Sequence, residues 1–356
     1  MKESDLYDLA KRVTTTSERA ATAARERQLR LTKPPGSLGT LEALGEKLCA
    51  IADAVPPPVP EPVTIAVFAG DHGVVRAGVT PWPSEVTGQM VANFLAGGAA
   101  INVIARHVGA RVVVVDVGVA HEVPGDTAGL LRRNVARGTA NLAEVAAMSR
   151  DETLAAISVG VEVALGEVAD GARLLVTGDM GIGNTTASAA LIAALTGALP
   201  EAVTGRGTGV DDETLARKVA VITGALARLA PDATALTTLS EVGGLEIAAL
   251  AGFVLAGASA RVPILIDGVI STAAALVAAT LAPATVGYLI AGHRSSEPGA
   301  SVALAHLNLE PVLDLELRLG EGSGAALAVP LVQAAAKILR EMATFDSAGV
   351  SERESP

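Results

Sequence analysis

Residues 173–197 read RLLVTGDMGIGNTTASAALIAALTG, so an apolar run, a glycine-rich turn and an alanine-rich segment follow one another directly. The run 174–176 is short enough for a buried strand, and the segment after Thr186 has the length of a helix. Asn184 or Thr185 would be a suitable N-cap, because either side chain has an oxygen that accepts a hydrogen bond from the first turn. We therefore expect a strand–loop–helix unit here.

The turn of this unit carries Gly178, Gly181 and Gly183. In such a turn, backbone N–H groups converge at the positive end of the helix dipole and bind phosphate without a basic side chain. An ordinary tight turn with glycines for close packing explains the same pattern. The spacing is neither the dinucleotide fingerprint nor a Walker loop, since no lysine follows the last glycine. A phosphorylated ligand other than ATP is the functional interpretation.

Composition limits the class of protein. The chain has 356 residues, 50% of them hydrophobic, which allows one large α/β domain or two smaller ones. A net charge of −11 argues against nucleic acid or an anionic membrane surface as the main partner, so an anionic substrate needs a locally assembled site. Cys49 is the single cysteine, which excludes a disulfide framework and favours a reducing compartment. We expect a cytoplasmic protein without a signal peptide.

The sequence also argues against a metal site and against a membrane span. The five histidines show no metal-ligand spacing, so we expect neither a metal nor a cofactor. Residues 268–292 hold no charged side chain and have the length of a membrane span. Pro283 divides that stretch into a helix-length and a strand-length piece, which predicts a buried helix followed by a buried strand rather than a span.

Apolar strand-like runs at 63–69, 111–119, 263–268 and 286–292 alternate with helix-length segments. This alternation predicts a parallel sheet with helices on both faces. Helices are expected at 3–30, 38–54, 86–105, 151–168 and 211–229, and a proline run at 56–62 separates the first two from the core.

Several polar or aromatic residues next to these elements are site candidates, each with a structural alternative. Asp71 and His72 follow the first strand, where open α/β sheets place ligands, although capping explains them nearly as well. Trp82 lies in a loop and would stack on a flat ligand or pack as a lid. Lys218 would neutralise a phosphate, or it would lie on a solvated helical face.

Glu321 lies between Gly320 and Gly322, just before a helix expected at 325–341. As a structural residue it would cap helix amides. As a functional residue it would accept a proton from a substrate. Capping lowers the pKa of a carboxyl group and enclosure raises it, and a useful base requires that enclosure match or exceed capping.

Taken together, these segments resemble a known family, nicotinate-nucleotide–dimethylbenzimidazole phosphoribosyltransferase. The resemblance covers nearly the whole chain, and TGDMGIGNTTASAAL with LRLGEGSGAALA are its most specific motifs. The matching segments are KPPGSLGTLE (33–42), AGDHGV (69–74), EVTGQMVANFLAGGAAINV (85–103), TGDMGIGNTTASAAL (177–191), GRGTGVDDETLARK (205–218), ILIDG (264–268) and LRLGEGSGAALA (317–328).

The resemblance implies a Rossmann-like α/β core at 63–308, with a small helical domain built from 1–62 and 309–356. It implies a homodimer that transfers phosphoribose from nicotinate mononucleotide to 5,6-dimethylbenzimidazole, giving α-ribazole 5′-phosphate and nicotinate. This reaction serves the assembly of the lower nucleotide loop of cobalamin.

The resemblance makes Glu321 the general base. It places Gly181 and Lys218 near the phosphate and ribose, and Ser295 near the nicotinate. Asp179 stands where members often carry Glu, and Gln89 does not align cleanly with a glutamine that lines the base pocket in some relatives. The expected substrate-binding residues are Gly181, Gly183, Asn184, Thr185, Lys218, Ser295, Asp179, Trp82 and Gln89.

Two other functions stay open on sequence. A transferase on the same scaffold would use purines or other azoles as acceptors. A non-catalytic nucleotide-binding module would keep the glycine loop and would not require Glu321.

Overall fold

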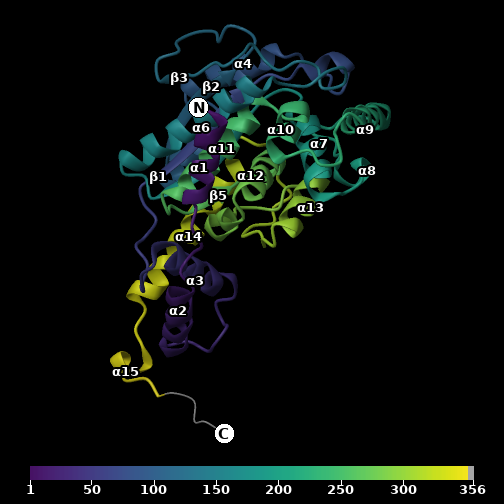
Figure 1. The fold of residues 1–356 in the computed structure, drawn as a ribbon. Coiled ribbons are helices and arrows are strands. Elements are labelled where there is room, and N and C mark those ends of the chain that lie inside the picture. The colour runs from purple at the N-terminus through teal and green to yellow at the C-terminus, as the bar shows by residue number, and fades with distance from the viewer. Residues whose placement is uncertain (352–356) are drawn as a thin grey trace.

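The computed structural model describes residues 1–351, whose helices surround a single sheet (Figure 1). The strands are β1 (Val63–Gly70), β2 (Arg111–Gly118), β3 (Leu130–Arg132), β4 (Leu174–Met180), β5 (Ile264–Ile266) and β6 (Leu289–Ala291). The helices are α1 (Glu3–Arg12), α2 (Glu18–Arg30), α3 (Thr40–Ala52), α4 (Glu85–Leu95), α5 (Ala100–Val108), α6 (Arg150–Ala169), α7 (Asn184–Thr196), α8 (Pro200–Val203), α9 (Asp212–Leu226), α10 (Ala235–Val242), α11 (Leu245–Ser259), α12 (Val269–Leu281), α13 (Pro298–His306), α14 (Ser323–Glu341) and α15 (Phe345–Ala348). Two 3₁₀ helices, η1 (Gly73–Ala77) and η2 (Pro283–Tyr288), complete the elements.

The six strands form one sheet in the order β3-β2-β1-β4-β5-β6, and every pair is parallel. This confirms the expected α/β fold, and the strand order is that of a Rossmann-type doubly wound sheet. The order reverses between β1 and β4, where such sheets open a crevice at the carboxyl ends of the strands. β3, which pairs with β2 through Val114 and Leu130, was not expected from the sequence.

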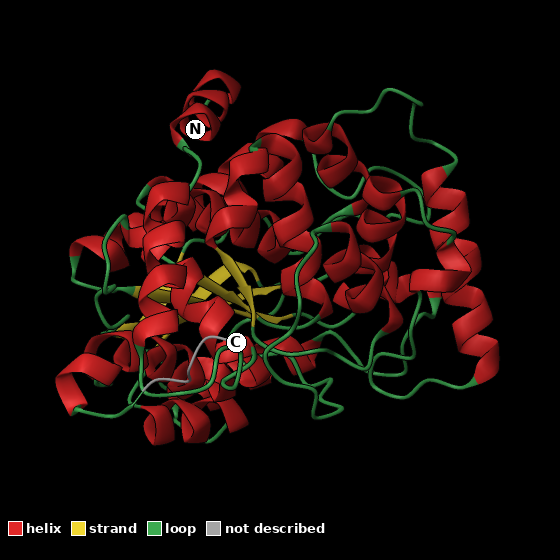
Figure 2. Cartoon of the chain, turned by 90° about the horizontal axis from the view of Figure 1, so that it is seen from below, coloured by secondary structure: helices red, strands yellow, loops and turns green. Residues whose placement is uncertain are grey.

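Helices cover both faces of the sheet, as Figure 2 shows with the strands enclosed by helices. The side chains of Ala66 and Phe68 on β1 join the cluster under α6, α11 and α12, while Ile65 and Val67 join the cluster under α5 and α14. Every residue of β1 is buried. Burial on both faces explains why this strand is apolar throughout instead of alternating.

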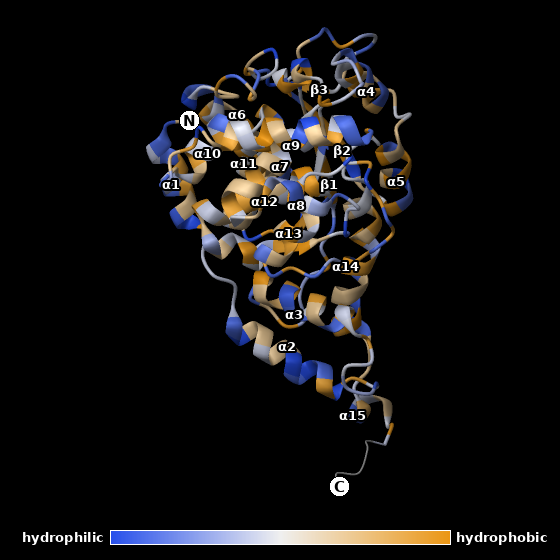
Figure 3. Cartoon of the chain, turned by 90° about the vertical axis from the view of Figure 1, so that its right-hand side faces the viewer, coloured by the Kyte–Doolittle hydropathy of each residue, from blue (hydrophilic) through white to orange (hydrophobic). Residues whose placement is uncertain are grey.

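Helices α2, α3 and α14 form a small helical part that extends from the main body (Figures 1 and 3). Its own apolar cluster joins both ends of the chain, through Ala20, Ala24, Leu31, Cys49 and Leu339. Helix α1 differs from the expected arrangement because it packs on α11 of the main body. The division of the chain at 62 and 308 stays a prediction, and residues 352–356 lie outside the described part.

Two expected helices are each divided in the structure. The segment 3–30 forms α1 and α2, which are separated by the non-helical residues 13–17. The segment 86–105 forms α4 and α5, because Gly97 adopts a left-handed conformation with φ +75° between them. A left-handed residue ends a helix, and glycine adopts this conformation at little cost.

The uncharged stretch 268–292 forms the buried helix α12 and the strand β6, as expected, with η2 between them. By length and composition alone, one other stretch of the described residues, Glu85–Val108, is apolar and long enough to cross a membrane. That stretch comprises α4 and α5 on either side of the break at Gly97.

Candidate active site

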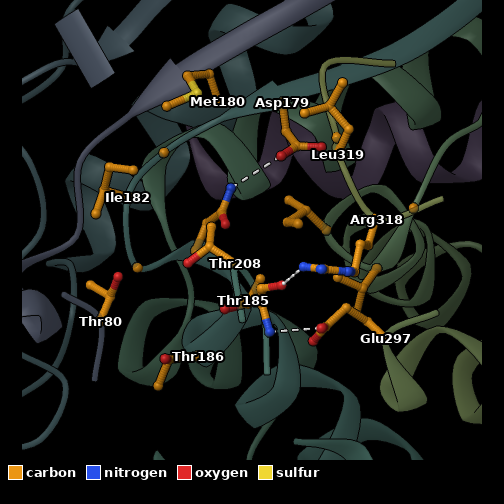
Figure 4. A pocket seen from close by; sticks show the side chains of 18 of the residues that line it. Thr80, Asp179, Met180, Ile182, Thr185, Thr186, Thr208, Glu297, Arg318 and Leu319 are labelled. Carbon is orange, nitrogen blue, oxygen red and sulfur yellow. Dashed lines mark hydrogen bonds between the residues drawn. The ribbon is translucent and has the colours of Figure 1, made fainter. Parts of the chain in front are cut away.

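A pocket of about 420 Å³ opens beyond the carboxyl end of β4, beside the point where the strand order reverses (Figure 4). Its volume lies within the usual range for sites that bind small molecules. The walls come from the loop after β4, the start of α4, the loop before α9, the ends of β5 and β6, and the residues before α14. Segments far apart in the sequence thus meet at the edge where doubly wound folds bind ligands.

The glycine loop after β4 leads into α7 through Gly183, which is the N-cap and adopts φ +96°. The expected cap by Asn184 or Thr185 was wrong. Asn184 is the first helical residue, and its side-chain amide donates to Oδ2 of Asp179 at 3.1 Å (Figure 4). Gly183 therefore ends the turn by backbone conformation alone, and the Asn184 side chain orients the carboxyl group of Asp179.

Lys218, in helix α9, contributes a buried positive charge to the pocket wall. Lys218 is only 1% exposed, and its Nζ donates to Oγ1 of Thr185 at 3.2 Å and to the carbonyl oxygen of Gly205 at 2.8 Å. The solvated-face interpretation of Lys218 is thus wrong. Burial lowers the pKa of its ammonium group, and the Glu297 carboxylate opposes that shift. A buried ammonium group in a pocket wall is placed to meet an anionic ligand group.

The loop beside Lys218 is held from two sides. Glu297 accepts a hydrogen bond from the Gly207 amide at 2.7 Å, and Arg318 donates to the Gly207 carbonyl at 2.8 Å (Figure 4). Arg318 comes from the segment just before Glu321, so it connects the 205–209 loop to the loop of the candidate base. This hydrogen bond therefore links two loops that both line the pocket.

Glu321 lines the pocket from a strained turn. It has φ +65° and lies between Gly320 at φ +83° and Gly322 at φ +89°. A non-glycine residue in this region costs about 1–3 kcal/mol, and such strain is commonly found at functional sites. Its backbone N–H donates to the carbonyl of Asp179 at 3.2 Å, which fixes the turn against the end of β4.

Glu321 is buried, with 4% of its surface exposed. Its carboxylate caps helix α5 and not α14, the helix that follows it. One oxygen accepts from the Ile101 amide at 3.2 Å, in the first turn of α5. Burial raises the pKa of this carboxyl group and outweighs the lowering by the Ile101 bond, while the charge of Asp267 raises it further. Enclosure therefore exceeds capping, which is the condition for a useful base.

Asp179 is buried next to other carboxyl groups. Burial raises its pKa well above the usual value, and the charges of Asp267, Glu246 and Glu321 raise it further against the bond from Asn184. Its Oδ1 has no hydrogen-bond partner within residues 1–351. Like charges that share a low-dielectric region disfavour each other's ionisation, so Asp179 holds its proton more tightly than an isolated carboxyl group does.

Three polar residues follow the ends of β5 and β6: Asp267, His293 and Ser295. The Nε2 atom of His293 lies 3.3 Å from Oδ1 of Asp267, and that oxygen also accepts from the Ala325 amide at 2.9 Å. Burial lowers the pKa of His293, but the adjacent Asp267 carboxylate raises it overall. Ser295 follows on the same loop and also lines the pocket. The ends of these strands thus support the start of α14.

The structure brings together Gly181, Gly183, Asn184, Thr185, Lys218, Ser295, Asp179, Trp82 and Glu321 around this pocket. Gln89 does not join them. It is exposed on α4, whose Val86 and Met90 line the pocket four residues apart on one helix face. The roles of the pocket residues in binding stay predictions.

Asp71 and His72 were expected as site candidates, but neither lines the pocket. Both are buried: Asp71 accepts from the Ala120 amide at 2.8 Å, and His72 pairs with Glu246. They lie behind the glycine loop instead of facing a ligand, because β1 turns away into η1 after His72.

Comparison with known proteins shows which family the chain belongs to. A family model described as "Phosphoribosyltransferase" matches residues 13–350. A nicotinate-nucleotide–dimethylbenzimidazole phosphoribosyltransferase from Salinispora tropica is 55% identical over 350 residues, which cover 94% of this chain and 96% of the relative. The chain belongs to the nicotinate-nucleotide–dimethylbenzimidazole phosphoribosyltransferase family. It is therefore an enzyme of the phosphoribosyltransferase class.

Other members agree with this assignment. The phosphoribosyltransferase of the same name from Chloroflexus aggregans is 56% identical over 338 residues, covering 95% of each chain. A crystal structure of a family member from Thermus thermophilus superposes with a TM-score of 0.90 at 50% identity, covering 95% of this chain and 100% of that one. The family fold thus extends over nearly all of the molecule.

Some polar residues of the pocket were missed as site candidates in the sequence. Glu297, Arg318 and His293 line it, while Asp267 lies beside His293 and Glu246 lies behind the glycine loop. Asp267 lies at the end of one expected strand and His293 directly follows another, which is the signal that made Asp71 and His72 candidates. Glu297 and Arg318 carry no such local signal. Among residues 1–351, no group of three or more His, Cys, Asp or Glu is arranged to hold a metal ion.

Proposed function

We propose that this enzyme transfers 5-phosphoribose from nicotinate mononucleotide to 5,6-dimethylbenzimidazole, giving α-ribazole 5′-phosphate and nicotinate for the lower nucleotide loop of cobalamin. The relatives are named for this nucleotide and this base. The observation that carries the proposal is one pocket lined both by a buried cation, Lys218, and by a buried carboxylate of raised pKa, Glu321.

The cationic end suits the phosphate of the nucleotide. The Lys218 ammonium group lies 3.2 Å from the Thr185 hydroxyl in the first turn of α7. The positive end of the α7 dipole and the ammonium group therefore act on the same volume. A phosphate held there places the ribose toward Asp179 and Glu321, which line the same pocket.

The opposite end suits the attacking base. The half-exposed Trp82 and Leu319 line the pocket and offer apolar surface for a flat ring. One imidazole nitrogen attacks C1′ from the face opposite nicotinate, and the C1′–nitrogen bond of nicotinate breaks. The bonding electrons return to the pyridinium nitrogen, so nicotinate leaves with a neutral ring and needs no acid. Inversion converts the β linkage into an α linkage.

Glu321 is the proposed general base. It takes the proton from the second imidazole nitrogen while the new bond forms, which keeps that ring from accumulating positive charge. Such catalysis typically contributes about 10²–10⁴-fold in rate. Alignment of both rings about C1′ supplies much of the remaining acceleration.

We propose that the enzyme works as a homodimer in the cytoplasm. The free thiol of Cys49 supports a reducing compartment: it is buried, and burial raises its pKa to about 12. The dimer rests on the family resemblance alone.

The test is to incubate the enzyme with nicotinate mononucleotide and dimethylbenzimidazole, without added metal, and to separate the products by chromatography. We expect α-ribazole 5′-phosphate and nicotinate in equal amounts. A parallel panel of purines and other azoles identifies the acceptor. Turnover only with another base would replace dimethylbenzimidazole, and binding without turnover for any base would favour a non-catalytic module.

A further inference from the structure

A fully buried pair, His72 and Glu246, lies behind the glycine loop and plays no part in the proposed reaction. Both side chains are 0% exposed, and Nε2 of His72 lies 2.6 Å from Oε1 of Glu246. His72 follows β1, and Glu246 is in the first turn of α11. Neither residue lines the pocket.

The pair is in direct contact with the back of the glycine loop. A Cβ added at Gly183 would lie 3.3 Å from the Cβ of His72, and one added at Gly181 would lie 3.4 Å from Oε1 of Glu246. A Cβ at Gly181 would also collide with the carbonyl oxygen of Gly70. The pair, together with Val74 and Val75 beside Gly183, therefore leaves the loop backbone little room to shift toward it.

The same pair also contacts the backbone on its far side. A Cβ added at Gly70 would lie 3.0 Å from Oε2 of Glu246, and one added at Gly244 would collide with Cε1 of His72. Glycines thus surround the pair at the end of β1, in the loop after β4 and before α11. This arrangement lets the position of the pair set the position of the loop.

The pair has the geometry of a charge-assisted hydrogen bond, with Nε2 of His72 and Oε1 of Glu246 2.6 Å apart. Burial lowers the pKa of His72, but the charge and hydrogen bond of Glu246, together with the charge of Asp71, raise it overall. A charge-assisted hydrogen bond is shorter and more directional than an apolar contact. Buried ion pairs add little net stability compared with packed apolar residues, so stability alone does not explain this pair.

We propose that His72 and Glu246 are positioning residues, which hold the backbone of 181–183 in the conformation that binds the phosphate of the substrate. They act through the loop and do not touch the ligand. The identity of that ligand as a ribose phosphate rests on the proposed function. The positioning itself rests on the contacts of the pair with the loop.

The experiment compares His72→Leu, which removes the donor, with His72→Gln, whose amide nitrogen can still reach Glu246. The matched control is Glu167→Gln, because Glu167 is a buried carboxylate paired with Thr64 and Arg111 and does not line the pocket. Two quantities are measured on each protein: the dissociation constant of ribose 5-phosphate by calorimetry, and the separate KM and kcat values for the two substrates. Circular dichroism and thermal melting show whether each variant is folded.

We expect His72→Leu to weaken the binding of ribose 5-phosphate and to raise the KM for nicotinate mononucleotide by about tenfold, which corresponds to losing about one hydrogen bond from a displaced loop amide to the phosphate. The kcat and the KM for the azole should change less than about threefold, since the uniform binding of one substrate is what is lost. His72→Gln should recover most of the affinity, and the control should bind like the wild type. If His72→Leu does not fold, Glu246→Gln replaces it with the same expected split.

Unchanged phosphate affinity in His72→Leu overturns the proposal, and so does an equal loss in kcat and in both KM values. Failure of the wild type to bind ribose 5-phosphate also overturns it. The proposed reaction is tested separately: a wild type that binds ribose 5-phosphate but forms no α-nucleotide refutes the reaction, while the positioning role is still decided by the variants.

Discussion

Replacing Glu321 by Gln changes the candidate base and little else. The amide has the same shape, and its carbonyl oxygen can still accept from the Ile101 amide, which lies 3.2 Å from the carboxylate. Gln also tolerates the turn no worse than Glu, because both share the same Cβ geometry at φ +65°. The substitution therefore removes the proton acceptor and leaves the pocket walls in place.

The expected loss follows from what a general base contributes. We expect kcat to fall by about 10²–10⁴-fold, which is about 2.7–5.4 kcal/mol of transition-state stabilisation. The affinity for nicotinate mononucleotide should be retained, since Lys218 and Thr185 at the other end are untouched. Steady-state turnover and calorimetric binding of the nucleotide measure the two quantities separately.

The pH dependence gives a second, independent result. The base works only when ionised, and burial raises the pKa of Glu321 above its usual value of 4.5. The kcat/KM of the wild type should therefore fall as the pH drops through this raised pKa, and the variant should lack this dependence. Burial disfavours the charged carboxylate in the folded state, so it lowers stability once the pH exceeds the unfolded pKa. The variant should accordingly melt no lower than the wild type near neutral pH.

Unchanged turnover in Glu321→Gln would refute the assignment of the base. A parallel loss of nucleotide affinity and turnover would also count against it, because it would mean that the carboxylate organises the pocket instead of accepting a proton. An unaltered acid limb in the pH profile of a weakly active variant would assign that limb to another group, such as Asp179.

Three further outcomes test the site and the fold. Lys218→Met should raise the KM for nicotinate mononucleotide by at least about tenfold, since a buried cation and two hydrogen bonds are lost; the exposed Lys11→Met is the control, and equal KM values for both variants would contradict the role. Gly181→Ala should lose nucleotide binding, because the added Cβ would collide with the Gly70 carbonyl oxygen. Gly166→Ala, at a position of α6 where a Cβ meets no neighbour, should bind the nucleotide and melt like the wild type, and calorimetry and thermal melting measure the two effects. Leu339→Ala should destabilise the helical part by about 2–5 kcal/mol in denaturant unfolding, since this buried side chain joins both chain ends, and a loss below that range would show that the cluster repacks.

The sheet was predictable because its strands are buried on both faces. Val63, Ile65 and Val67 face one cluster while Ala66 and Phe68 face the other, so the apolar run was unbroken and recognisable. The short edge strand β3 was not, because three residues, two half-buried leucines and an exposed arginine, are too few to show a strand pattern. The breaks in the helices lie at Gly97, where glycine ends α4 in a left-handed conformation, and at the non-helical residues 13–17.

The site was predictable where one residue carried both a local pattern and the chemistry. Glu321 between two glycines and the turn with Gly181 and Gly183 are of this kind. The position of Lys218 was not readable from its helix, because only the fold places Gly205 and Thr185 around it. The same limit applies to His72, whose place behind the loop depends on Glu246, 174 residues further along the chain.

The pocket also accounts for how an acidic protein accepts an anionic substrate. The chain carries a net charge of −11, so its field opposes the approach of a nucleotide. Around the 205–209 loop, Lys218 and Arg318 concentrate positive charge, and the dipole of α7 adds to it. Burial raises the pKa of Asp179 well above its usual value, which disfavours a negative charge on that residue, and it also raises the pKa of Glu321. Lys218 and Arg318 donate to loop oxygens of Gly205, Thr185 and Gly207, while one oxygen of Glu321 accepts from the Ile101 amide. Within residues 1–351 neither cation is paired with Glu321, so the groups that attract the phosphate and the proton acceptor line one cavity without neutralising each other.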